Sequence, residues 1–306
     1  MIEVEEIGAT ALGRLVAVHN AVRRDDPAAI EEFVDWKRQA GATVWLVAVA
    51  SGEDVGAGVG VAGWHARPQT AHIEAWALPA VRGRGVGSAL LGELTRWSAR
   101  NGCTAVETPV AEDDGASVAW VQHRGFVEVG RDSRLVLDLG PIEAPAVAPP
   151  DGIEIVAWAD RPGLEEAMYE VYLEAEPDIP GEEETEPPSL EQWLANDMRG
   201  VADRPEAVFV ALSGSEVVGF AKLALPARWT GTAHHDLTGV RRAWRGRGIA
   251  GALKRAQIRW AKEQGYRRLV TSNEERNEPI RRLNARHGYR VEPGRVLMRA
   301  PIAAAR

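Results

Sequence analysis

The chain contains the same pattern twice, and this duplication limits its possible folds more than any other feature. The stretch RGRGVGSALL begins at Arg82 and RGRGIAGALK begins at Arg245, so the two copies are 163 residues apart (245 minus 82). The offset holds without a gap to residue 126 and pairs Trp97 with Trp260. Self-similarity over such a length indicates two copies of one domain, which agrees with the chain length of 306 residues.

A segment rich in proline and alanine separates the copies. It reads LGPIEAPAVAPPDG and covers residues 139–152. Proline removes a backbone donor and stiffens the chain, so the segment has the composition of a linker. We therefore expect an N-terminal domain over 1–140, a linker over 141–151 and a C-terminal domain over 152–306.

Composition excludes several classes of protein. Cys103 is the only cysteine, which rules out an internal disulfide framework and a cysteine-rich zinc site. A net charge of −8 argues against a nucleic-acid partner.

The N-terminus is acidic and the apolar runs are strand-sized, so we expect no signal peptide and no membrane partner. The adjacent His234 and His235 have no third ligand nearby, so we expect no metal site. The sequence thus predicts a cytoplasmic protein.

Both copies show the same order of elements. Val86, Leu90, Leu94 and Trp97 form one apolar face, which predicts a helix directly after the RGRG loop. Two β-rich runs joined by a short turn precede this loop, so strand hairpins are followed by one crossover helix, which implies an α/β fold with a mixed sheet. The other expected elements are strands 2–6, 103–110, 153–157 and 266–272 and helical segments 9–23, 28–39, 162–175 and 189–197, with a second helix and a final strand closing each copy.

The glycine-rich loop between strand and helix predicts an anion site. Glycines let backbone N–H groups approach a ligand, and the N-terminus of the following helix adds free donors and a positive dipole end. A tight turn made for packing alone would use similar residues, but its repetition at the same distance from later landmarks favours phosphate. The expected contacts are Arg82, Gly83, Arg84, Gly85, Val86, Gly87 and Ser88, and Arg245, Gly246, Arg247, Gly248, Ile249, Ala250 and Gly251.

Two common phosphate motifs do not fit this loop. Neither copy has the Gly-Lys-Ser/Thr of a Walker A loop. Residues 246–251 satisfy the dinucleotide pattern GxGxxG, but no acidic residue closes a second strand about 20 residues later. The first copy also has Ser88 where the third glycine would stand.

The loop resembles motif A of the GNAT superfamily of N-acetyltransferases. Arg82-x-x-Gly85-x-Gly87 and Arg245-x-x-Gly248-x-Ala250 match its [RQ]-x-x-G-x-[GA] form after a strand. The second copy also contains Asn277-x-x-Ile280-x-x-x-Asn284-x-x-His287-Gly288-Tyr289, which is similar to the family's motif B. The resemblance is specific over 233–290 and looser over 71–126.

This resemblance implies a tandem protein with two GNAT-like, mostly antiparallel sheets flanked by helices. It implies acetyl-CoA as cofactor, with the pyrophosphate on the loop amides and the pantetheine arm beside the fourth strand near Ala77 or Val240. Asn277 and Asn284 match positions that face the cofactor. The implied reaction is transfer of the acetyl group to an amine by direct attack in a ternary complex.

The fourth strand of the second copy offers candidates for the base. Alternation puts His234 and Asp236 on one face and His235 on the other unless a bulge intervenes. We expect His234 with Asp236 to be catalytic, although a packed or solvated histidine is an equal alternative. At the offset of 163, His72 pairs with His235 and Ala77 with Val240.

The family's tyrosine acid is missing from both copies. It would stand four residues before the glycine of motif B, where the sequence has Val121 and Asn284. The first copy departs further, because Asp114 stands in the place of Asn277 and a carboxylate repels a phosphate ligand. We therefore expect the second domain to be the catalytic one.

The sequence leaves the acceptor and the oligomeric state open. The leading hypothesis is a small-molecule amine. The alternatives are a protein or peptide amine, and a non-catalytic acyl-CoA sensor, which the missing tyrosine favours. The run of Glu182, Glu183, Glu184 and Glu186 is a solvated loop in the simplest interpretation, but beside an acceptor site it would attract a cationic amine.

Overall fold

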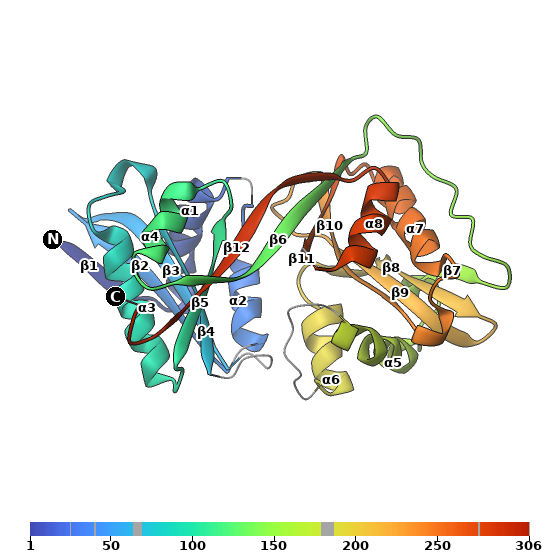
Figure 1. Cartoon of the computed structure of the whole chain (residues 1–306), viewed down its shortest axis with the longest axis horizontal. Helices are drawn as coiled ribbons and strands as arrows, with labels where there is room; N and C mark the ends of the chain where they lie inside the picture. The colour runs from blue at the N-terminus through green and yellow to red at the C-terminus, as the bar shows by residue number, and fades with distance from the viewer. Residues whose placement is uncertain (25, 40, 64–68, 179–186, 275, 306) are drawn as a thin grey trace. The chain divides into compact units, whose positions relative to one another are not determined.

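A computed structural model of the chain describes residues 1–305 except 25, 40, 64–68, 179–186 and 275. The chain divides into two compact units (Figure 1). Unit 1 comprises Met1–Asp132 together with Pro293–Arg306, and unit 2 comprises Ser133–Glu292.

The described strands of unit 1 pair in the order β1-β2-β3-β4-β5-β12. Their pairs are antiparallel except for β4 and β5, which run parallel. The strands are β1 (Ile2–Glu6), β2 (Ala42–Ala50), β3 (Glu53–Ala62), β4 (Thr70–Ala77), β5 (Ala105–Ala111) and β12 (Arg290–Pro301), and the α-helices are α1 (Leu12–Val22), α2 (Ile30–Gln39), α3 (Val86–Arg100) and α4 (Gly115–Gln122).

Unit 2 repeats this plan in the order β6-β11-β10-β9-β8-β7. Here β10 and β11 are the parallel pair. The strands are β6 (Val127–Asp138), β7 (Glu154–Ala157), β8 (Asp203–Ser213), β9 (Glu216–Ala224), β10 (Thr232–Val240) and β11 (Arg268–Glu274), and the helices are α5 (Glu165–Ala175), α6 (Leu190–Trp193), α7 (Ile249–Glu263) and α8 (Glu278–Arg286). The expected mixed, mostly antiparallel sheet flanked by helices is confirmed.

Alternation along the strands explains why helices cover both faces of each sheet. On β2, Val44 and Leu46 pack in one cluster with the predicted apolar face of α3, whereas Trp45 and Val47 pack in another with α1. Successive side chains of a strand point to opposite faces, so a strand buried on both sides is apolar throughout. Val86, Leu90 and Leu94 are buried as the spacing predicted.

The last strand of each copy does not close its own unit. The chain leaves unit 1 within β6 and returns to it within β12. In unit 1, Arg295–Pro301 of β12 pair antiparallel with Ala105–Ala111 of β5. The expectation that each copy ends on its own closing strand was therefore wrong. The expected domains, 1–140 and 152–306, were drawn from the two sequence repeats, and these bounds stay a prediction.

The expected linker packs along α7 of unit 2. Lys262 Nζ donates to the Leu139 carbonyl at 2.7 Å, and Arg255 Nε donates to the Val147 carbonyl at 2.8 Å. A proline-rich segment has few backbone N–H groups that could bond to its own carbonyls. The hydrogen bonds from Lys262 and Arg255 therefore hold the segment against the helix. In the described part of the chain, the helices are too short or too polar for any of them to span a bilayer.

We predict that Met298→Ala destabilises unit 1 although Met298 lies in the second copy. Met298 is fully buried in the cluster that contains α3. Truncation of a buried methionine costs about 2–5 kcal/mol. Hydrogen exchange should show faster opening of β2, β3 and β4, whereas Val291→Ala, at a position 63% exposed on the same strand, stays within about 0.5 kcal/mol. Faster exchange confined to unit 2 would contradict the strand exchange.

Candidate functional site

Each unit contains a gap between its two parallel strands. In unit 2, β10 pairs with β11 from Thr232–Arg268 to His234–Val270, and beyond these residues the strands part. In unit 1, β4 pairs with β5 from Thr70–Ala105 to His72–Glu107 and then parts in the same way. Backbone groups that lose their strand partner at such a gap are available to an extended ligand.

In both units a cavity lies at the gap between the parallel strands. In unit 2 it has a volume of about 1220 Å³ and is lined by residues 235–238 and Val240 of β10, residues 271–274 of β11 and the whole glycine loop 245–251. In unit 1 the cavity has a volume of about 360 Å³ and is lined by Ile73–Ala77, Thr108–Ala111 and parts of the loop. The expected Ala77 and Val240 thus both lie at a cavity wall.

The loop of unit 2 fits a pyrophosphate. Gly246 and Gly248 have φ of 75° and 87°, a conformation that glycine adopts without strain. Gly248 is the N-cap of α7, and no described side chain caps this helix end. The N–H groups of Ile249, Ala250 and Gly251 therefore lack partners within the helix and form the positive end of its dipole. The loop of unit 1 has the same geometry, with Gly85 as the N-cap at φ 92°.

The first arginine of each loop already has a carboxylate partner. Arg245 pairs with Asp178 at 2.6 Å, and its Nε donates to the Val240 carbonyl at 2.9 Å. Arg82 pairs with Asp114 at 3.5 Å. The two side chains therefore order the start of the loop, and the backbone amides are the freer donors for an anion.

Aromatic packing makes the cavity of unit 1 narrower. A Cβ on Gly87 would lie 3.4 Å from the ring of Trp120. Arg124 stacks on that ring at 3.9 Å and donates to the Ser88 hydroxyl at 2.9 Å. At the offset of 163, unit 2 has Leu283 and His287 in place of Trp120 and Arg124.

The two asparagines taken from the family resemblance have structural partners. Asn277 is the N-cap of α8, and its Oδ1 accepts from the Ile280 N–H. Asp114 caps α4 in the same way. Asn284 is fully buried, where its Oδ1 accepts from Lys254 Nζ at 2.8 Å. Asn277 lies at the cavity wall, but Asn284 is not among the residues that line it.

A bulge in β10 changes the pairing of the histidines between the copies. The register against β9 shifts between His235 and Thr238, whereas β4 pairs with β3 without a shift. The positions before the bulge are therefore offset by 162, because Thr70 and Thr232 hold the same place in their parallel pairs. His72 corresponds to His234, and the expected match of His72 with His235 was wrong.

The bulge also decides which side chains reach the cavity. His235 and Asp236 line the cavity, and His234 does not. His235 is buried, and its ring lies 5.6 Å from that of Tyr289. His234 lies edge-on to Trp229 at 5.9 Å, and its charge contributes to lowering the pKa of Asp236. Simple alternation would have put His234 and Asp236 in equivalent positions.

Asp236 belongs to a cluster around one lysine. Lys222 Nζ pairs with Asp236 at 2.6 Å and with Asp203 at 3.0 Å, and it also donates to the Asp197 carbonyl. Burial raises the pKa of Asp236, but the charge of Lys222 outweighs it and holds that pKa below its ordinary value. Burial raises the pKa of Asp197 to about 6. Two carboxylates thus pair with Lys222, and the carboxyl group of Asp197 interacts with it electrostatically.

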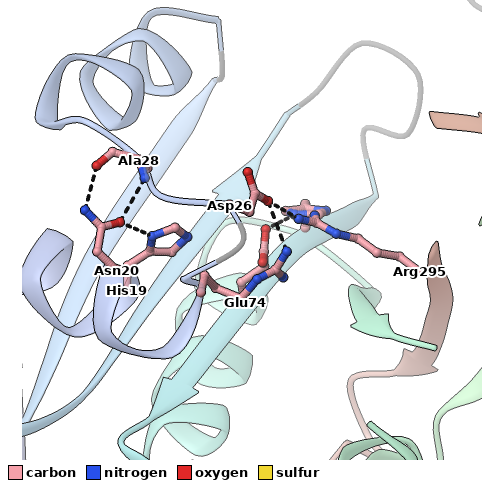
Figure 2. Close-up of polar contacts among 8 residues, drawn as sticks. His19, Asn20, Asp26, Ala28, Glu74 and Arg295 are labelled. Atoms are coloured by element: carbon pink, nitrogen blue, oxygen red, sulfur yellow. Dashed lines mark hydrogen bonds and ion pairs between the residues drawn. The ribbon is translucent and has the colours of Figure 1, made fainter. Parts of the chain in front are cut away.

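Unit 1 carries a related carboxylate, Glu74 on β4 (Figure 2). At the offset of 162 that holds before the bulge, Glu74 corresponds to Asp236. His72 Nε2 lies 3.3 Å from Glu74 Oε1. Burial raises the pKa of Glu74, but the bond to His72 and the charges of Arg295 and Arg23 hold it below its ordinary value.

The other side of this cluster is fixed by a short turn after α1. Asn20 binds both the N–H and the carbonyl of Ala28, at 2.8 and 2.9 Å (Figure 2). The turn between them carries Asp26, which pairs with Arg295 of β12. The exchanged strand therefore brings a cation of the second copy to the fourth strand of the first.

Lys222 and Lys254 were not predicted from the sequence. Both are buried, and Lys254 lines the cavity. Comparison of the copies could have found them, because the offset of 163 puts Val59 and Leu91 at these places. The acidic run Glu182–Glu186 lies outside the described residues. Within the described part, no group of three acidic, cysteine or histidine side chains is arranged to hold a metal ion.

Comparison with known proteins matches both copies to one family. The model of the Acetyltransferase (GNAT) family matches residues 15–126 and 165–289. No curated protein matches the sequence.

Solved structures share the whole two-unit fold. A GCN5-related N-acetyltransferase from Sphaerobacter thermophilus is 24% identical, with a TM-score of 0.74 over 98% of this chain and 96% of that one. A tandem GNAT protein from the clavulanic acid biosynthesis pathway is 20% identical, with a TM-score of 0.77 over 99% of both chains. At these identities the likeness shows the fold.

We predict that Lys222→Met destabilises unit 2 in a pH-dependent way. Removal of one partner from a buried ion pair costs about 3–5 kcal/mol. Because the pKa of Asp236 is lowered in the fold, the stabilisation by Lys222 is present above the pKa of an unfolded aspartate, about 3.9, and is lost as the pH falls through the folded pKa. Urea unfolding should show a large difference from the natural chain at pH 7 and a smaller one as the pH falls below about 3.9. An equal difference at neutral and acidic pH would contradict the charge argument.

Proposed function

The chain belongs to the GNAT acetyltransferase family, and on this premise we propose that unit 2 transfers the acetyl group of acetyl-CoA to a primary amine of a small, cationic molecule. The observation that carries the proposal is the large cavity of unit 2, which joins an uncapped helix N-terminus to a strand gap with a carboxylate at its wall.

The proposed cofactor site runs along this cavity. The N–H groups of Ile249, Ala250 and Gly251 would hold the pyrophosphate, and the free edge of β10 up to Val240 would hold the pantetheine arm. Pro150 of the linker segment lies 3.8 Å from where a Cβ of Gly248 would be, so it borders the same loop. When bound, acetyl-CoA supplies an electrophilic thioester carbon and a thiol leaving group.

We assign the handling of the amine to Asp236 and His234. The Asp236 side chain is 43% exposed at the cavity, so its carboxylate can receive the ammonium of the acceptor. Its lowered pKa keeps it ionised at neutral pH, which makes it a weak base. His234 does not line the cavity but interacts electrostatically with Asp236, and an imidazole is the side-chain type that most readily takes up a proton near neutral pH, so we assign it the proton that the amine loses by way of Asp236.

The charge around Asp236 supports a cationic acceptor. The carboxylates of Asp203 and Asp236 pair with Lys222, and the carboxyl group of Asp197 interacts with it electrostatically, so ionisation of all three exceeds the charge of this lysine. Negative charge at this end of the cavity raises the local concentration of cations there, whereas the glycine-loop end, with Arg245, Arg247 and Arg255, suits an anion. This argument rests on described residues and does not need the acidic run 182–186.

Unit 1 is proposed as a weak binder or a structural partner. Its cavity is smaller, Trp120 packs against the first turn of α3, and Asp114 lies beside the loop at Arg82. Because Glu74 gives unit 1 a carboxylate as well, the role of unit 1 depends on whether acetyl-CoA enters its cavity.

A matched pair of substitutions tests the cofactor site. Ala250 and Gly87 correspond at the offset of 163, and both lie in the first turn of a helix, so tryptophan fits the backbone there. We expect Ala250→Trp to lower the affinity for acetyl-CoA by at least about 100-fold, the equivalent of about 2.7 kcal/mol, because the indole fills the donor site. Gly87→Trp should leave the tight site unchanged in calorimetry. Loss of tight binding in Gly87→Trp alone would move the active site to unit 1.

Release of free thiol from acetyl-CoA across a panel of amines tests the reaction. We expect cationic small amines to react faster than neutral ones, and Asp236→Asn to lower kcat/KM by about 100-fold, the lower end of an acid–base contribution. Binding without turnover on any amine would support the non-catalytic sensor instead. Turnover confined to peptide amines would support the alternative of a protein acceptor.

A further inference from the structure

The cores beneath the two cavities differ in chemical character. In unit 1 four buried positions next to the cavity are apolar, and at the offset of 163 the same positions in unit 2 are polar. The pairs are Leu91 and Lys254, Leu94 and Gln257, Val110 and Asn273, and Val121 and Asn284. Since unit 1 forms the same fold with apolar residues, the fold does not require the polar ones. Burial of polar groups costs free energy, so their presence in unit 2 needs another reason.

Lys254 is the centre of this polar core. Its side chain is 1% exposed on α7, and its Nζ donates to Asn284 Oδ1 at 2.8 Å. Asn284 Nδ2 in turn donates to Asn273 Oδ1 on β11 at 2.7 Å. The two asparagines thus fix the amine in one place, and Nζ lies 5.3 Å from the ring centre of Tyr289.

Lys254 lies in the cavity wall at the closed end of the strand gap. Lys254 lines the cavity together with His235, the residue at which β10 begins to part from β11. An ammonium has three donors, and within the described part of the chain only the bond to Asn284 occupies one of them. The remaining protons are therefore available to an atom in the cavity.

Lys254 is also the group here that changes its charge near neutral pH. Burial lowers its pKa to about 7, and no carboxylate in the described residues raises it again. The other titratable groups that face it are His235 from β10, His287 after α8 and Tyr289. Burial and the charge of Lys254 hold the pKa of His235 well below its ordinary value, and burial lowers the pKa of His287 and raises that of Tyr289.

We propose that Lys254 is a catalytic residue of unit 2, the proton donor to the sulfur that leaves when the acetyl group is transferred. This inference rests on the proposed function. As the C–N bond forms and the C–S bond breaks, the electron pair of the C–S bond stays on sulfur and takes a proton from the Lys254 ammonium. The ammonium of the acceptor first loses one proton to water, and the attacking amine loses the second to His234 by way of Asp236; His234 then releases this proton to water, and Lys254 regains one from water. Asn284, which stands where the family resemblance leads us to expect a tyrosine acid, is the positioning residue for the amine.

The decisive test measures the ionisation of coenzyme A bound in unit 2, with no turnover involved. An ammonium beside the sulfur favours the thiolate and lowers the thiol pKa. The variant is Lys254→Leu, which introduces the residue of unit 1, and the control is Lys262→Leu on the same helix, whose lysine bonds to Leu139 instead. All are compared in a Gly87→Trp background, so that the signal comes from unit 2.

Ultraviolet titration of the bound thiolate should give a thiol pKa at least about one unit higher in Lys254→Leu than in the Lys262→Leu control, a tenfold change in the ionisation constant. Should Lys254→Leu fail to fold, Lys254→Leu with Asn284→Val restores the apolar pair of unit 1 and takes its place. An unchanged thiol pKa in a folded variant that still binds coenzyme A would overturn the proposal.

Turnover supplies a second readout. With a reactive amine, Lys254→Leu should lower kcat by about 100-fold at pH 7, the lower end of general acid catalysis, with the affinity for acetyl-CoA unchanged. Because an acid must be protonated to act, kcat of the natural chain should fall as the pH rises above about 7, and this fall should be absent from the variant. Retention of that fall in the variant would refute the assignment. If no amine reacts, the proposed function fails, but a shifted thiol pKa still supports the ammonium beside the sulfur.

Discussion

The parting of one parallel strand pair is the constraint on which both sites depend. In each unit the fourth and fifth strands pair for three residues and then separate, so that backbone groups of β4 or β10 have no strand partner beyond that point. A polar backbone in an apolar setting must find another partner, and an extended ligand provides one. The helix that follows, α3 or α7, begins at a left-handed glycine directly beside this gap. The parting of the two strands thus places a channel for an extended ligand next to an anion site at the helix N-terminus.

The two units share one fold but differ in the residues at their cavities. Their backbones agree in strand order and in loop geometry, yet the core beneath the cavity is apolar in one and polar in the other. Leu91 and Val121 satisfy the packing of unit 1, whereas Lys254 and Asn284 satisfy the same packing only by bonding to each other. A buried amine is tolerated when a hydrogen bond satisfies one of its N–H donors. Burial then brings its pKa near neutral pH, where it can both give up and regain a proton. The bulge in β10 adds a second difference, since it turns Asp236 towards Lys222 and the cavity.

The sequence predicted much of the architecture and part of the site. Apolar spacing located α3 and α7, glycines located the loops, and the offset of 163 located the second copy. Side-chain pairing was less predictable, because it depends on register. A single inserted residue in β10 shifts the match of His72 from His235 to His234, and no local pattern marks that residue. Asn277 and Asn284 were found by motif, but their hydrogen bonds to α8 and to Lys254 depend on neighbours far along the chain.

Local chemistry explains what the sequence determined by itself: two copies, a glycine turn before each amphipathic helix, and the family that these motifs indicate. Those features depend on residues a few positions apart, whose geometry is fixed by backbone preferences and helical periodicity. The tertiary structure alone decided which strand closes which unit, which arginine reaches Glu74, and which lysine lies in the cavity wall. Each of these joins residues distant in sequence, and their contact is set by packing of the whole sheet, which no short segment encodes.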